Sequence, residues 1–252
     1  MAAPLKYKLL ILLLLLPVLS FSQQYRLTGR RIEATVGLGS THYFGDIGGA
    51  ESENNLLGLR DIDLFTTRPN VNFGGRYRIN ENMNVRANLV FGYLEGNDLN
   101  SKNEARNYAF STSVYEFTGV YEYCIIPEQY PINYRMSSLW DGLSFNNASL
   151  NTYVFGGLGF TYFDVTPLQD LKSSDGFHTG SNMSLVVPLG VGIKYPIASA
   201  IHLGFEFGGR WAATDYLDGY TSKWSTANDV YYFSMLNVVI KIDAYSRGGF
   251  GR

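Results

Sequence analysis

The sequence is poor in charge, in cysteine and in long apolar runs. Charged residues make up 17% of the 252 residues, whereas ordinary soluble domains contain roughly 25%. The formal net charge of −2 offers no electrostatic attraction to nucleic acid, so we expect no nucleic-acid partner. The single cysteine, Cys124, excludes an intrachain disulfide framework.

Aromatic residues and glycine are abundant instead. The chain contains 19 Tyr, 16 Phe and 27 Gly. Low charge with many tyrosines and glycines is typical of a membrane β-barrel, whose aromatic girdles and tight turns use these residues. The same composition also fits a secreted β-sandwich, so composition alone leaves both classes open.

The long apolar run lies at residues 9–16, between a short basic region and Pro17. Small residues follow at Ser20 and Ser22, which completes the pattern of a secretory signal peptide. We therefore predict a cleaved signal peptide at 1–22 and an exported mature chain, 23–252. The run is too short to span a bilayer comfortably as a helix, and no later segment approaches about 18 consecutive apolar residues.

The clearest periodicity lies at residues 201–211, where apolar residues or glycine alternate with a second set. Side chains of a β-strand point to opposite faces with period two, so this segment is a strand with two unlike faces. One face is aromatic and uncharged, with Phe205 and Trp211, and the other combines glycine with Glu206 and Arg210. Glycine is depleted on solvated strand faces. We infer a crowded interior in which glycine makes room for an ion pair, and an apolar outside that faces lipid.

The same alternation recurs along the mature chain and predicts eight strands in all. They cover approximately residues 31–44, 71–78, 84–93, 115–123, 151–163, 184–195, 201–211 and 236–243. The fifth strand is apolar or glycine on both faces, so its inward face cannot be assigned. Pro188 in the sixth strand lacks a ladder hydrogen bond and predicts a β-bulge.

Long and short connections alternate between these strands, which indicates an all-β fold, an eight-stranded antiparallel transmembrane β-barrel of the outer-membrane type. We expect periplasmic termini, periplasmic turns at 79–82 and 196–200, and external loops near 45–66, 96–107, 164–182 and 215–228. Side chains fill the lumen of a barrel of this size, so no open channel is expected.

The connection at 127–149 is the exception, because it is long and yet falls on the periplasmic side. It contains apolar residues that cannot all rest in water without cost, namely Tyr134, Leu139, Trp140, Leu143 and Phe145. Two interpretations stay open. The segment packs under the barrel mouth as a plug, or it forms a docking surface for a periplasmic partner.

Six charged residues fall on the inward faces of the predicted strands. They are Arg76, Arg86, Glu116, Glu122, Glu206 and Arg210. Charges inside a narrow barrel must be paired, so we interpret this set as a structural ion-pair network and not as acid–base machinery.

The external loops carry acidic residues that could hold calcium through oxygen ligands. These are Asp46, Asp98, Asp215, Asp218 and Asp229. Their spacing matches no calcium loop, so solvated loop carboxylates are the favoured interpretation. His42, His178 and His202 are too scattered for a metal site. A nucleophile with His42 and Asp46 is conceivable, but no motif supports it. We expect no enzyme activity, no cofactor, no metal and no small-molecule substrate.

Several clusters together resemble one family, over nearly the whole mature chain and in the same order. The clusters are Tyr43-Phe44-Gly45-Asp46, Arg106-Asn107 before Phe110 and Glu116, the run from Tyr153 to Gly159, the run from Pro188 to Tyr195, Gly204-Phe205-Glu206 with Arg210, and Thr214-Asp215-Tyr216-Leu217-Asp218. They are similar to the PorG-type outer-membrane barrel proteins of the Bacteroidota type IX secretion system.

This resemblance implies an outer-membrane barrel that anchors a periplasmic ring of the secretion and gliding apparatus. Its partners would be outer-membrane lipid, a ring lipoprotein and the partner of that lipoprotein. It implies no catalytic residues. Other readings are a general surface barrel for adhesion or small-solute passage, an outer-membrane enzyme with a His near a Ser or Asp on the external rim, and a soluble lipocalin-like carrier with the aromatic face inward.

Overall fold

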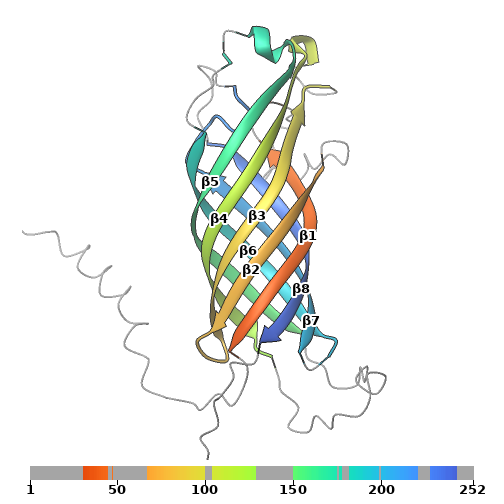
Figure 1. Cartoon of the computed structure of the whole chain (residues 1–252). Coiled ribbons are helices and arrows are strands. Elements are labelled where there is room, and N and C mark those ends of the chain that lie inside the picture. The colour runs from red at the N-terminus through yellow and green to blue at the C-terminus, as the bar shows by residue number, and fades with distance from the viewer. Residues whose placement is uncertain are drawn as a thin grey trace, which may run out of the picture.

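The computed structural model is a closed barrel of eight antiparallel strands that pair in chain order (Figure 1). The strands are β1 (Ile32–Phe44), β2 (Arg68–Arg78), β3 (Met83–Asn97), β4 (Tyr108–Ile126), β5 (Asn151–Gln169), β6 (Met183–Pro196), β7 (Ile201–Ala212) and β8 (Val230–Ile242). Two short 3₁₀ helices are added, η3 (Glu104–Arg106) and η6 (Asp170–Ser173). The predicted fold class is confirmed.

The structure describes residues 31–44, 47, 67–99, 104–128, 150–174, 176–177, 182–198, 200–220 and 228–242. The predicted signal peptide, 1–22, lies outside them. None of the helices in this part of the chain has both the length and the apolar character needed to cross a membrane.

The two ends of the barrel differ in their connections (Figure 1). At one end, the turn end, lie the tight β2–β3 and β6–β7 turns, the start of the β4–β5 connection, and the pairing of Ile32 with Ile242. The other long connections, between β1 and β2, β3 and β4, β5 and β6, and β7 and β8, lie at the opposite end, the loop end. The predicted alternation of short and long connections is therefore confirmed.

β4 and β5 are much longer than predicted, at 19 residues each. Their pairing continues from Tyr108 opposite Gln169 through Val114 opposite Phe163, beyond the wall formed by the other strands (Figure 1). The predicted external loop at 164–182 is therefore wrong in its first part, which is strand. Inward and outward side chains still alternate in this extension, as the buried and inward-facing Phe110 and Phe163 show.

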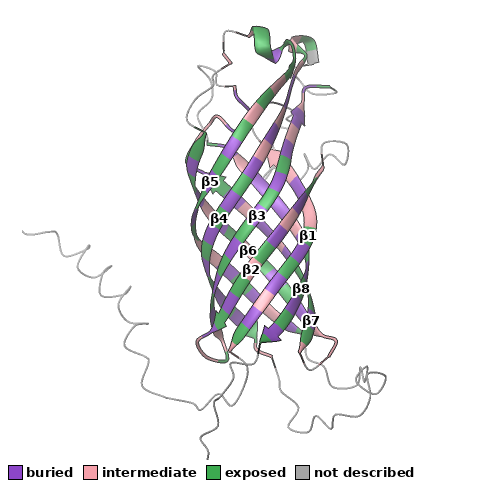
Figure 2. Ribbon diagram, in the orientation of Figure 1, coloured by how far each residue is buried: buried purple, intermediate pink, exposed green. Residues whose placement is uncertain are grey.

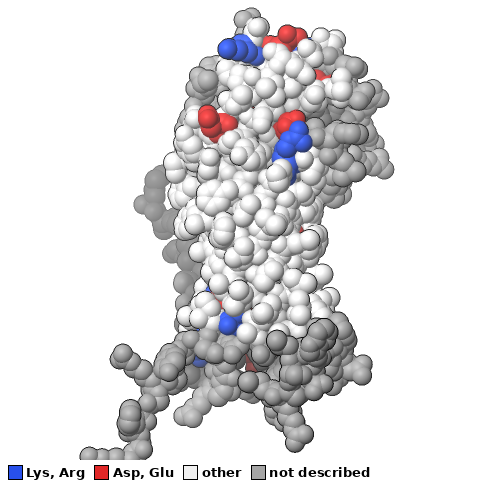
Figure 3. All heavy atoms as spheres, turned by 45° about the vertical axis from the view of Figure 1, so that its right-hand side comes forward, with Lys and Arg blue, Asp and Glu red and all other residues white. Residues whose placement is uncertain are grey.

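Exposed and buried residues alternate along every strand (Figure 2). On β7, Phe205 and Trp211 are 41% and 59% exposed, whereas Glu206 and Arg210 are each 3% exposed. The predicted assignment of faces is thus confirmed, and a soluble carrier with inward aromatic residues is excluded. Figure 3 shows almost no charge over the middle of the wall, with charged side chains towards the two ends. Such an apolar band needs lipid around it.

An aromatic row marks the loop-end edge of this band. Phe73, Phe91, Tyr115 and Tyr162 come from four neighbouring strands, and successive ring centroids lie 6.3, 5.7 and 6.2 Å apart. Beyond this row the outward positions of the longest strands become polar, as at Asp164. Aromatic girdles of this kind sit at membrane–water interfaces.

The structure settles the inward face of β5, which the sequence left open. Tyr153 and Phe155 point into the lumen. A Cβ atom on Gly192 would lie 2.4 Å from Cζ of Tyr153, and one on Gly190 would lie 2.5 Å from Cζ of Phe155. Glycine therefore does make room inside the barrel, but chiefly for two aromatic rings and less for an ion pair.

The bulge predicted at Pro188 does not form. The β5–β6 register is the same on both sides of it, because Gly156 pairs with Leu189 and Gly159 with Val186. The ladder is interrupted only between these two pairs, at residues 157–158 of β5 and 187–188 of β6. An interruption is expected there because proline has no N–H to donate. The register shift in the ladder lies instead between Cys124 and Ile126, at the turn end of β4.

Replacing Gly192 by Ala should destabilise the barrel by about 1–3 kcal/mol, because the added methyl group collides with the ring of Tyr153. Gly75→Ala is the matched control, since nothing lies within 4 Å of a Cβ at that position. The measurement is urea unfolding of the refolded barrel in lipid vesicles. Equal midpoints for the two variants would contradict the packing argument.

Candidate functional site

The turn half of the lumen is filled by a compact ion-pair network. Arg86 donates from Nη1 and Nη2 to the two carboxylate oxygens of Glu206, at 2.6 and 2.9 Å. Nε of Arg86 and Nε of Arg76 lie 2.8 and 2.7 Å from the two oxygens of Glu122. The four side chains are buried, and their charges balance. The predicted pairing is therefore observed for these four residues.

An aromatic residue completes this network. The hydroxyl group of Tyr153 donates to Oε1 of Glu206 at 2.6 Å, and the guanidinium carbon of Arg76 lies 5.2 Å from the centre of its ring. Cation–π contacts of this kind are strengthened by burial. The ring thus serves as both a polar and an apolar partner for the buried charges.

Sequence reasoning did not single out the charges nearest the turn end. Glu33 accepts from Arg76, Arg78 and Lys194, at 2.9, 3.0 and 3.0 Å. All three bases come from other strands. The signal was present, because Glu33, Arg78 and Lys194 lie on the polar face of predicted strands.

Glu116 and Arg210 form a separate group nearer the loop end. Nε of Arg210 lies 3.5 Å from Oε1 of Glu116, and the hydroxyl group of Tyr231 donates to Oε2 at 2.6 Å. The guanidinium carbon of Arg210 lies 4.4 Å from the ring centre of Phe233. The six predicted lumen charges are therefore all paired, but in two groups rather than in one network.

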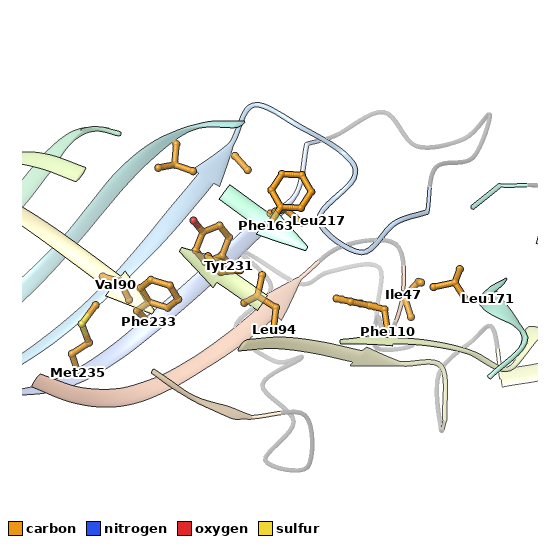
Figure 4. Packing of buried hydrophobic residues seen from close by; sticks show 13 residues of the cluster. Ile47, Val90, Leu94, Phe110, Phe163, Leu171, Leu217, Tyr231, Phe233 and Met235 are labelled. Atoms are coloured by element: carbon orange, nitrogen blue, oxygen red, sulfur yellow. The ribbon is translucent and has the colours of Figure 1, made fainter. Parts of the chain in front are cut away.

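An apolar cluster fills the lumen at the loop end (Figure 4). Leu94, Phe110 and Phe163 reach it from the long strands, and Leu217 reaches it from the β7–β8 connection. Thr112 donates its hydroxyl group to the carbonyl oxygen of Leu217 at 2.6 Å. The described part of this connection is thereby held inside the barrel mouth.

Three of the five acidic residues that we predicted to be solvated loop carboxylates are buried, whereas Asp215 is half-buried. Asp98, Asp218 and Asp229 are at most 2% exposed. Asp229 accepts from the hydroxyl group of Tyr43 at 2.6 Å and from the backbone N–H of Leu217 at 2.9 Å. These carboxylates interact with donor groups of the protein in place of water. These interactions hold the loops in place.

Asp98 pairs with Arg106 of η3. Burial alone lowers the pKa of Arg106, but the hydrogen bond and the charge of Asp98 outweigh this effect and raise its pKa.

Within the described residues, no three His, Cys, Asp or Glu side chains gather in a way that could hold a metal ion. Asp46 and His178 lie outside these residues.

The two described histidines have different surroundings. His42 lies on β1 with Oγ of Ser40 at 3.2 Å from Nε2 and Oγ1 of Thr67 at 3.2 Å from Nδ1. His202 lies at the turn end, where Nε2 is 2.8 Å from Oε1 of Glu128. Glu128 follows β4 in a segment without periodicity, so no sequence signal pointed to it.

The predicted docking residues are not placed by the structure. Tyr134, Leu139, Trp140, Leu143 and Phe145 lie outside the described residues, which stop at Glu128 and resume at Leu150. Their role stays a prediction.

Removing one member of the Arg86–Glu206 pair should be costly, because it leaves a buried charge without its partner. We expect Arg86→Met to lower the free energy of unfolding by about 3–5 kcal/mol. The double variant with Glu206→Met should lose less than the sum of the two single changes. Arg68→Met is the control, since its pair with Glu95 is partly exposed and is worth at most about 1 kcal/mol. Urea unfolding in vesicles measures all four, and additive losses would contradict the coupling.

Solved structures with a similar shape are outer-membrane proteins, at low identity. Neisserial surface protein A is 12% identical with a TM-score of 0.44, over 84% of this chain and 97% of that chain. OprG of Pseudomonas aeruginosa is 11% identical with a TM-score of 0.44, over 85% and 97%. The outer membrane enzyme PagL is 14% identical with a TM-score of 0.37, over 83% and 99%. Because these identities and TM-scores are low, the similarity gives no information on function.

No protein of curated function matches the chain. The family model described as "Domain of unknown function (DUF6089)" matches residues 7–245, which is nearly the whole sequence, so the chain belongs to that family.

Proposed function

We propose that this protein is an outer-membrane barrel that anchors a periplasmic ring assembly of the type IX protein secretion and gliding apparatus. The observation that carries the proposal is a lumen occupied by paired charges and apolar side chains inside a wall with an apolar outside. Ion pairs fill the turn half and apolar side chains fill the loop end. A barrel of this kind holds a fixed position in lipid and offers its ends to partners. Anchoring by itself requires no catalysis.

The orientation follows from the connections. In bacterial outer-membrane barrels the short turns face the periplasm and the long loops face outward. The turn end, with Arg31 and Ile242, would then be periplasmic. The connection that begins at Pro127 leaves from this same end, so it would meet a periplasmic partner directly.

The resemblance to PorG-type barrels supports the choice of partner, a ring lipoprotein and its own partner. Its most specific cluster, Thr214 to Asp218, lies in the loop-end connection. There Leu217 is fully buried and Asp218 accepts from the backbone N–H of Tyr220 at 2.8 Å. Small-solute passage is less well supported, because the paired charges and the apolar cluster leave no continuous polar path.

Replacing Leu139, Trp140 and Phe145 together by Ala should abolish co-purification of the ring proteins from detergent-solubilised membranes. The apolar side chains of the 127–149 connection would no longer be available for docking. The barrel itself should still shift its mobility on heating in gels, because its strands are unchanged. Unchanged co-purification would remove this docking surface from consideration.

The matched control is Leu99→Ala with Leu168→Ala, which removes exposed apolar side chains at the loop end. It should leave co-purification intact.

Deletion of the gene distinguishes the secretion role from that of a general surface barrel. Secretion through the type IX apparatus should stop without this barrel, whereas it continues if the protein is a general surface barrel for adhesion.

A second candidate function, a surface esterase, is favoured by one observation. Ser40, His42 and Thr67 stand in the order nucleophile, base and orienting group, each 3.2 Å from the next. Ser40 is the first polar residue beyond Leu38 on the outward face of β1. It therefore lies on the face of β1 that the barrel turns to lipid.

In such a reaction Oγ of Ser40 would bond to the ester carbonyl carbon while His42 takes the hydroxyl proton. The ester C–O bond would then break, and the alcohol would leave with that proton. Water would hydrolyse the acyl-serine to a fatty acid and restore the serine. Nothing further in the described residues identifies donors for the oxyanion, which is why this function stands second.

Fatty-acid release from phospholipid or lipopolysaccharide vesicles tests the esterase. Wild-type protein should release fatty acid, and Ser40→Ala and His42→Ala should each reduce the rate by about 10² or more. Ser113→Ala is the control, an outward-facing serine on β4. The esterase is rejected if the wild-type protein is inactive or if Ser40→Ala is as active as Ser113→Ala.

A further inference from the structure

Glu128 reaches into the turn-end mouth of the barrel from outside the strand ladder. It lies two residues after Ile126, the last residue of β4. Its carboxylate contacts Arg78 at 2.9 Å, His202 at 2.8 Å and Lys194 at 3.8 Å, and it accepts a hydrogen bond from Nζ of Lys241. No other described carboxylate enters the lumen from a connection at this end.

The four basic partners form a socket whose side chains start from the strand ladder and not from the segment that carries Glu128. Arg78, Lys194, His202 and Lys241 come from β2, β6, β7 and β8, so each is positioned by its own strand. The side chains of the four are between 2% and 9% exposed. The ladder would hold these donors in place around the mouth if Glu128 moved away. We call these four residues the basic socket.

Glu33 and Glu128 both contact bases of the basic socket. Arg78, Lys194 and Lys241 carry three positive charges, and Glu33, which contacts Arg78 and Lys194, supplies one negative charge. Deeper in the lumen, Arg76 and Arg86 are already matched by Glu122 and Glu206. Withdrawal of Glu128 would remove a negative charge that contacts Arg78, Lys194 and Lys241, and the loss of a counter-charge is unfavourable for buried bases.

The surrounding basic residues lower the pKa of Glu128. Burial alone would raise its pKa, but the hydrogen bond from His202 and the charges of Lys194 and Lys241 hold its pKa well below the ordinary value of a glutamate. It thus binds in the socket as an anion. An oxyanion surrounded by several strong donors is the arrangement expected of a binding site.

We propose that the basic socket is an oxyanion-binding site, occupied in this structure by Glu128 of the same chain. A carboxylate from another source can take its place when Glu128 is withdrawn or replaced. That source is either an acidic side chain of a partner protein or a small free anion. The site does not depend on the secretion role, since it rests only on the geometry of the mouth.

Chemical rescue of Glu128→Ala by acetate tests the socket. The full-length variant in detergent micelles should lose its heat-resistant gel mobility at a temperature at least about 5 °C below wild type. Sodium acetate at neutral pH should restore the midpoint in a saturable manner, and sodium chloride at the same ionic strength should not. Wild-type protein, with the socket filled, should show no acetate-specific shift.

Two variants serve as controls. Glu95→Ala removes a carboxylate paired with Arg68 at the loop end, and acetate should not rescue it. Glu128→Ala combined with Lys241→Met lacks a socket donor, so it should lose most of the rescue. If Glu128→Ala fails to assemble, the folded yield after refolding in acetate is compared with that in chloride, and a higher yield in acetate supports the site.

The source of the anion is distinguished by a second arm in which tetraglutamate replaces acetate and tetralysine is its control. Rescue by tetraglutamate supports a side chain of a partner as the ligand, and rescue by acetate alone supports a small free anion. The proposal is overturned if neither restores the midpoint, if chloride acts equally well, or if Glu95→Ala is rescued to the same extent.

Discussion

The pairing of buried charge inside a wall that faces lipid is the constraint on which the rest of this structure depends. The apolar outside of the barrel can face only hydrocarbon, so charged side chains on the opposite face of each strand must find their partners within the lumen. Arg86 and Glu206 show the solution, with two parallel hydrogen bonds between fully enclosed groups. Partners come from different strands, so the network forms only when the barrel closes.

The lumen is divided along its axis, and this division bears on function. Charges occupy the turn half, and an apolar cluster occupies the loop end, where the β7–β8 connection folds back inside (Figure 4). Both ends are held by connections as well as strands, since Leu217 enters from one side and Glu128 from the other. The contacts between connections and strands are thus found at both ends of the barrel.

The alternation along individual strands was sufficient to predict the fold and six of the charged residues that are paired in the lumen. Glu206 and Arg210 could be assigned to the inside because the opposite face of β7 carries large aromatic residues. β5 could not be assigned in this way, because Tyr153 and Phe155 share the apolar character of their neighbours. Their direction depends on the space left by Gly190 and Gly192 of β6, and that is a property of the pairing between strands.

Local pattern by itself therefore determined the number of strands, their order and, for every strand except β5, the face turned to lipid, because period-two side-chain geometry is a property of a single strand. Only the tertiary structure decided how the charges divide into two groups, that Asp218 and Asp229 are buried, and that Glu128 fills a socket of four bases. These features join residues that are far apart in the chain. Such contacts follow from the closure and register of the barrel, and no periodicity within one segment encodes them.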